Sequence, residues 1–115
     1  AVLENEAYKI FEMKKQTRIE FMEKAVKVRN NWLKKIPAVV HVDNTARVQT
    51  VSEKFNPTFY RLIKEFYKIT NVPVILNTSF NLNGEPIVMT PSDAIRTFHT
   101  CGLDTLVLEN YVIEK

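Results

Sequence analysis

Residues 56–77 read NPTFYRLIKEFYKITNVPVILN, and they contain the clearest helix pattern of the chain followed by a strand pattern. The first part of this stretch predicts a helix, because Asn56 is a favourable N-cap and Pro57 suits the first helical position. Apolar residues then recur at helical spacing. The run at 72–77 is short, apolar and β-branched, which is typical of a buried strand. A capped helix that leads directly into a buried strand predicts an α/β fold.

Helix and strand patterns alternate along the rest of the chain. Helices are predicted at residues 4–13, 56–70 and 90–102, and the last of these carries a capping box at Thr90 followed by Pro91. Strands are predicted at residues 21–29, 38–42, 46–52, 72–77, 85–89, 103–109 and 111–113. Asn83-Gly84 is a two-residue hairpin signal that turns the chain into residues 85–89.

These elements predict a single domain over residues 1–115, with one mixed, twisted sheet and helices packed on it. The apolar helix stripes should be buried against that sheet, and their members are Phe59, Leu62, Ile63, Phe66, Ile95 and Phe98.

Composition limits the class of protein. The net charge is +3, and the basic excess lies in residues 1–50, which hold ten Lys/Arg against six Asp/Glu. Aromatic residues do not alternate with these lysines, so a solvated surface is favoured over a nucleic-acid site. No apolar run has the length of a membrane span, and the single Cys101 indicates a reducing, cytoplasmic setting. The apolar start at Ala1 suggests a piece of a longer polypeptide.

A basic residue surrounded by polar neighbours lies in the strand predicted at 46–52. Arg47 and Gln49 share one face of that strand, and Thr45 points the same way. A guanidinium beside hydroxyl and amide groups can hold a phosphate or a carboxylate. The alternative is a surface ion pair with Asp43 or Glu53, and the segment alone leaves the two interpretations even.

A second polar group follows the strand at 72–77. Asn77 and Ser79 stand two residues apart in NTSFN and share a side if the chain is extended. Their amide and hydroxyl groups can bind a polar or anionic ligand. The alternative, favoured on local grounds, is that both residues cap turns through their own backbone. If the anion site exists, the side-chain tips of Arg47, Asn77 and Ser79 should lie close together.

The remaining candidates are weaker. His41 is expected to be a satisfied core histidine, and Asp43 is either a base or the cap of a turn. His41, His99 and Cys101 lack metal-ligand spacing, so no metal site is predicted in the chain.

Three blocks resemble a known family: PAVVHVDNTARVQTVS at 37–52, the long run from Asn56 to Phe98, and GLDTLVLENYVI at 102–113. They resemble the C-terminal, YrdC-like domain of the O-carbamoyltransferases of nodulation-factor and antibiotic biosynthesis. The resemblance implies a partial domain of a larger enzyme whose N-terminal, actin-like domain carries a metal and the acceptor site. The C-terminal domain would take carbamoyl phosphate and ATP, with Mg, form carbamoyl-adenylate and release pyrophosphate.

The resemblance also implies roles for individual residues. Arg47, Asn77 and Ser79 fall on the family's residues that bind carbamoyl phosphate, and Arg47 is the expected catalytic residue. Asn44 stands where the family has glycine, and it tolerates positive φ better than most residues. The family's upstream Gly-Pro-Arg loop has no counterpart in this sequence, which implies half a site. The chain alone is therefore expected to be inactive and to self-associate through exposed faces.

Two other functions compete with this one. The first is a stand-alone nucleotide- or RNA-binding YrdC-like module. The second is an interaction domain in which the site residues have no role. Partners expected from the resemblance are carbamoyl phosphate, ATP and the rest of the parent polypeptide, with no membrane and no nucleic acid.

Overall fold

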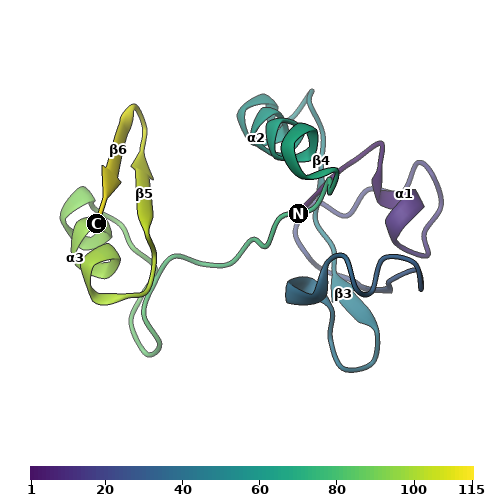
Figure 1. Cartoon of the computed structure of the whole chain (residues 1–115), viewed down its shortest axis with the longest axis horizontal. Coiled ribbons are helices and arrows are strands. Elements are labelled where there is room, and N and C mark those ends of the chain that lie inside the picture. The colour runs from purple at the N-terminus through teal and green to yellow at the C-terminus, as the bar shows by residue number, and fades with distance from the viewer. The chain divides into compact units, whose positions relative to one another are not determined.

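The computed structural model describes all residues, 1–115, and they form two compact units, Ala1–Asn77 and Thr78–Lys115 (Figure 1). Both units contain helices and short strands, which confirms the predicted α/β class. Each unit is described by itself below. The prediction that residues 1–115 make one domain stays a prediction.

The first unit contains seven elements. They are β1 (Val2–Leu3), α1 (Ala7–Ile10), β2 (Ala25–Lys27), the 3₁₀ helix η1 (Pro37–Val39), β3 (Thr45–Arg47), β4 (Thr50–Val51) and α2 (Pro57–Thr70). The second unit contains α3 (Pro91–Thr100), β5 (Thr105–Leu108) and β6 (Tyr111–Glu114).

The strands form three two-stranded sheets, so the expectation of one continuous sheet is wrong. β1 runs parallel to β4, whereas the β2–β3 and β5–β6 pairs are antiparallel. The strand predicted at 72–77 reduces to one antiparallel bridge between Val2 and Val74. Pro73 has no N–H to donate, which limits the ladder at this point. β1 still lies between β4 and this segment, since Leu3 N donates to Pro73 O and Ile75 N to Ala1 O.

Two further predicted strands are absent. Residues 38–42 are not a strand, because Pro37 starts a 3₁₀ turn in which Val40 N donates to Pro37 O. Residues 85–89 form no ladder either. The predicted turn at Asn83-Gly84 is present, with Gly84 at φ 83° and Glu85 N bonded to Leu82 O. Beyond the turn, Val88 N to Phe80 O is the one backbone hydrogen bond that residues 86–89 make to the preceding segment.

Helix α2 has the ends that its sequence predicts. Asn56 Oδ1 accepts from Phe59 N at 3.2 Å, Pro57 occupies the first turn, and Asn71 takes the left-handed conformation at φ 58°. The helix contacts the core through a narrow stripe, in which Ile63 is fully buried beside Leu3 and Val51.

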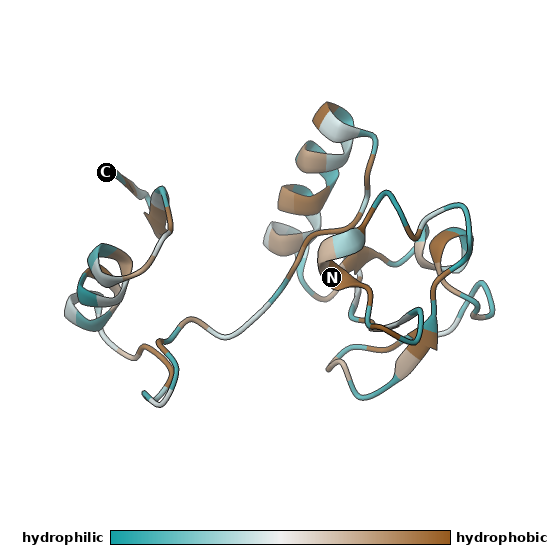
Figure 2. Ribbon diagram, turned by 60° about the horizontal axis from the view of Figure 1, so that its bottom comes forward, coloured by the Kyte–Doolittle hydropathy of each residue, from teal (hydrophilic) through white to brown (hydrophobic).

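The predicted burial of the helix stripes is correct only in part. Ile63 and Phe98 are fully buried, and Phe59 is half-buried. Leu62 is 59% exposed, and Phe66 and Ile95 are each 40% exposed. The reason on α2 is that its own unit covers only the side that bears Ile63. Figure 2 shows the apolar residues that recur along this helix.

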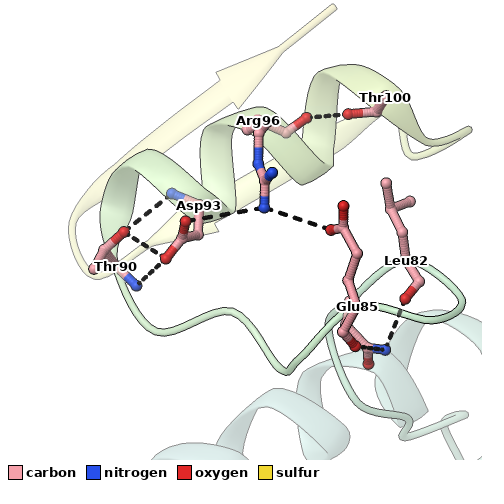
Figure 3. A network of polar contacts seen from close by, with 7 residues as sticks. Leu82, Glu85, Thr90, Asp93, Arg96 and Thr100 are labelled. Carbon is pink, nitrogen blue, oxygen red and sulfur yellow. Dashed lines mark hydrogen bonds and ion pairs between the residues drawn. The ribbon is translucent and has the colours of Figure 1, made fainter.

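In the second unit, Ala94 and Phe98 of helix α3 pack against Leu106 of β5. Its capping box is complete: Thr90 Oγ1 accepts from Asp93 N at 3.1 Å, and Thr90 N donates to Asp93 Oδ2 at 3.1 Å. Arg96 lies between Asp93 and Glu85, with Nη2 3.4 Å from Glu85 Oε2 (Figure 3). The cap therefore fixes the helix start, and Arg96 joins the helix to the preceding turn.

Substituting the cap gives a first testable expectation. Thr90→Ala removes both hydroxyl bonds to Asp93, and we expect it to lower the free energy of unfolding of this unit by about 1 kcal/mol. The Thr90 hydroxyl, which donates to the carboxylate, lowers the pKa of Asp93 from its ordinary value of 3.8. The stabilisation is thus present above that value and is lost as the pH falls through the lower folded pKa. Urea unfolding at pH 7 and at pH 2 measures this, with exposed Ser92→Ala as control. If Thr90→Ala lowered the free energy of unfolding equally at both pH values, this would contradict the role of the Asp93 carboxylate.

Candidate functional site

A cation with free donors lies at the end of β3. Arg47 is exposed, pairs across the sheet with Ala25, and donates from Nε to Met22 O at 3.1 Å. This bond orients the side chain and leaves the two terminal nitrogens of the guanidinium without a partner in the chain. No carboxylate pairs with Arg47, so the surface ion pair with Asp43 or Glu53 that the sequence left open does not form. The guanidinium fork is therefore available for an anion.

An amide pair connects the end of segment 72–77 to the strand region that contains β4. Asn77 Nδ2 donates to Gln49 Oε1 at 2.7 Å, and Gln49 Nε2 donates to Glu20 O at 3.1 Å. The two segments meet here because both flank β1, where Val2 N donates to Gln49 O. Asn77 thus bonds to a residue far away in the sequence, and the expectation that it only caps its own turn is wrong.

Arg47 and Asn77 line the same cavity, which has a volume of about 250 Å³. Gln49 and His41 also border it, and the rest of the wall is largely apolar, including Val39 and Leu76. Pockets for drug-sized ligands measure about 300–1,000 Å³. This cavity is therefore suited to a small ligand with one anionic group and a few polar atoms.

The loop before β3 forms one edge of the cavity, and hydrogen bonds between Asp43 and Thr45 hold this loop. Asp43 Oδ1 accepts from the Thr45 backbone N–H at 3.0 Å and from its hydroxyl at 2.7 Å. The Thr45 hydroxyl lowers the pKa of Asp43, so this carboxylate acts as the cap of the turn and is a poor base. Asn44 has φ 63°, in the left-handed region that favours glycine and that asparagine tolerates.

His41 is exposed and lies outside any strand, so the expectation of a core histidine is wrong. Its Nδ1 is 3.0 Å from Thr45 Oγ1, whose only proton is directed to Asp43. Nδ1 must therefore carry a proton and donate it, which leaves Nε2 as the free ring nitrogen. His41 can offer this nitrogen to a ligand in the cavity that it borders.

Ser79 belongs to the second unit, where it is exposed and its hydroxyl bonds to nothing in the chain. Its shared site with Arg47 and Asn77 stays a prediction, as does the binding of one anion by Arg47 and Asn77 together. Sequence reasoning missed the carbonyl oxygens of Glu20 and Met22, which orient Gln49 and Arg47. The pattern of side chains in a sequence does not indicate which backbone carbonyls of an irregular loop will accept hydrogen bonds.

The fold and the cavity together define an α/β module with a polar corner suited to a small anion. Residues 1–115 match the family described as "Carbamoyltransferase C-terminus", and the chain belongs to that family.

Several curated proteins are similar to it. Nodulation protein NolO of Bradyrhizobium diazoefficiens is 47% identical over 116 residues, a match that covers all of this chain and 21% of NolO. Nodulation protein NolNO of Sinorhizobium fredii is 46% identical over 116 residues, again covering all of the chain and 17% of that protein. The 3'-hydroxymethylcephem-O-carbamoyltransferase of Amycolatopsis lactamdurans is 41% identical over 71 residues, or 62% of this chain and 14% of the enzyme. The chain thus spans about a fifth or less of the length of these relatives.

The helices of this chain are too short or too polar to cross a lipid bilayer.

Proposed function

We propose that this chain is the C-terminal part of a cytoplasmic O-carbamoyltransferase and binds carbamoyl phosphate. The observation that supports this most is the cavity shared by an unpaired guanidinium and an amide held in place by Gln49. Membership of the carbamoyltransferase C-terminus family supports the same class of substrate. One relative is by name an O-carbamoyltransferase, which makes an acceptor hydroxyl the expected destination of the carbamoyl group.

The two sides of the cavity suit the two ends of carbamoyl phosphate. The free nitrogens of Arg47 would donate to the phosphate oxygens in a charge-assisted, bidentate manner. Asn77 would contact the carbamoyl group, which has both a carbonyl acceptor and N–H donors. Ser79 stays a candidate ligand residue on the sequence alone. Thr45 and Asp43 would hold the adjoining turn, and His41 could contact the ligand through Nε2.

ATP enters the proposal as a co-substrate. Hydrolysis of carbamoyl phosphate at its P–O bond gives carbamate and phosphate, and a carbamate oxygen then attacks the α-phosphorus of ATP. The products are carbamoyl-adenylate and pyrophosphate, so one water is consumed and phosphate and pyrophosphate appear in equal amounts. Magnesium would arrive with the ATP phosphates, as it usually does. We assign none of its ligands to this chain, in which no three His, Cys, Asp or Glu side chains are grouped to hold a metal.

The proposal predicts different activities for the 115-residue chain alone and for the whole protein that would contain it. We expect the purified 115-residue chain, mixed with ATP and carbamoyl phosphate, to release pyrophosphate at the rate of a sample without protein. Adenylation has to neutralise two phosphorylated substrates, and preorganised donors are usually the largest contribution to such catalysis. Arg47 is the only arginine or lysine that borders the cavity. The whole protein should instead release pyrophosphate and phosphate in a 1:1 ratio.

Two results would count against this proposal. Steady turnover by the chain alone would show that the site is complete within residues 1–115. Absence of pyrophosphate release by the whole protein, with carbamoyl phosphate and ATP both present, would remove the proposed reaction.

A further inference from the structure

The hydrogen bonds of Gln49 settle which atoms of Asn77 remain free. The backbone oxygen of Glu20 can only accept, so the Gln49 atom that faces it at 3.1 Å must be the donor Nε2. Gln49 therefore turns Oε1 toward Asn77, and this oxygen can only accept. The Asn77 atom at 2.7 Å from it must be the donor Nδ2. The Glu20 carbonyl thus fixes the orientation of the Gln49 amide, and the Gln49 amide in turn fixes that of Asn77.

The consequence is a defined pattern of donors and acceptors. Asn77 retains its carbonyl oxygen Oδ1, which has no partner in the chain, and one N–H. Arg47, which lines the same cavity, can only donate. The cavity is thus lined by a residue that can only donate and by Asn77, whose Oδ1 is an acceptor with no partner in the chain. A ligand that matches it needs an anionic group and, beside it, an N–H donor.

We propose that Gln49 is a positioning residue that makes the site selective for an N–H-bearing acyl phosphate over its methyl counterpart. Held by Gln49, Asn77 Oδ1 accepts a hydrogen bond from the amino group of a carbamoyl ligand. An acetyl ligand of the same shape presents a methyl group at this point and leaves Oδ1 unpaired. Without Gln49 the amide of Asn77 can turn over, and the preference for N–H is lost. This inference rests on the proposed binding of carbamoyl phosphate.

Two non-hydrolysable probes differ only at the group in question. Phosphonoacetamide has an amino group on its carbonyl carbon, and 2-oxopropylphosphonate has a methyl group. By titration calorimetry of the whole protein, we expect the first to bind about tenfold more tightly, the effect of one hydrogen bond to an otherwise unpaired acceptor. In Gln49→Met, which keeps the length of the side chain, the ratio should fall below about threefold. The affinity for 2-oxopropylphosphonate should change by less than about twofold.

The chain has a matched control. Gln16 is its only other glutamine, is exposed and makes no hydrogen bond, so Gln16→Met should leave the ratio at the wild-type value. The hydrogen bond itself is measurable without a ligand in the 115-residue chain labelled with ¹⁵N-asparagine. The side-chain amide of Asn77 should exchange one of its protons with water slowly in the wild type and both protons fast in Gln49→Met.

The outcomes separate this inference from the proposed function. A wild-type ratio that persists in Gln49→Met, or slow exchange of the Asn77 amide in that variant, overturns the role of Gln49 and leaves the proposed function standing. Equal binding of the two probes by the wild type, with Arg47 required for both, likewise removes only the selectivity. Failure of the wild type to bind either probe removes the proposed function and the selectivity together.

Discussion

Replacing Arg47 with alanine should lower carbamoyl-phosphate-dependent pyrophosphate release by the whole protein at least about tenfold, if one phosphate bond is lost, and up to about ten-thousandfold if two are lost. The guanidinium has two terminal nitrogens free, because only its Nε is engaged, by Met22 O. Each charge-assisted bond to a phosphate oxygen is worth about 1.5–3 kcal/mol, which is about one to two decades in rate or affinity. Initial rates measured with a coupled pyrophosphate assay give the loss directly.

Two variants sharpen this test. Arg47→Lys should recover little activity, since an ammonium group cannot reproduce a planar fork of donors. Arg61→Ala is the matched control: Arg61 is also exposed, donates from Nε to the carbonyl of Pro57 and forms no ion pair, but it does not border the cavity. Wild-type pyrophosphate release in Arg47→Ala would exclude Arg47 from the mechanism.

The second large effect concerns stability. Phe98→Ala should unfold the unit formed by residues 78–115, because Phe98 is fully buried at the centre of its small core. A buried Phe→Ala change costs about 3–5 kcal/mol. A unit of this size buries too little surface to absorb such a loss. Backbone hydrogen exchange of the 115-residue chain should then show loss of protection in α3, β5 and β6.

The same exchange experiment contains its own control regions. Amides of α2 and of β1 belong to the other unit and should keep their protection in Phe98→Ala. Ile87→Ala, at a position that is 63% exposed, should leave both units protected. Protection of α3 that survives in Phe98→Ala would show that its core does not depend on this side chain. Loss of protection in α2 as well would show that the two units unfold together.

Helix ends were predictable from the sequence, because capping is a local matter. Asn56, Pro57 and Asn71 define α2, and Thr90 with Asp93 starts α3 as expected. Strands were predicted less well, because a ladder needs a partner that the local sequence does not specify. Residues 38–42 have the composition of a strand, but Pro37 draws the backbone into a 3₁₀ turn.

The candidate site was predictable in its residue types and only partly in its contacts. The period of two placed Arg47 and Gln49 on one strand face, and both border the cavity together with Asn77. The hydrogen bond between Gln49 and Asn77 depends on β1 lying between their segments, which is a long-range feature. Leu62 and Phe66 were predicted to be buried but are exposed. A helical stripe predicts an apolar face but does not say what covers that face.

The most direct test is a crystal structure of the whole protein with bound phosphonoacetamide. We predict that the phosphonate oxygens lie within hydrogen-bonding distance of the terminal nitrogens of Arg47. The amide nitrogen of the ligand should face Asn77 Oδ1, while Asn77 Nδ2 keeps its bond to Gln49. A ligand bound elsewhere, or one in this cavity with its phosphonate away from Arg47, would contradict the assignment of residues 1–77 to carbamoyl phosphate binding.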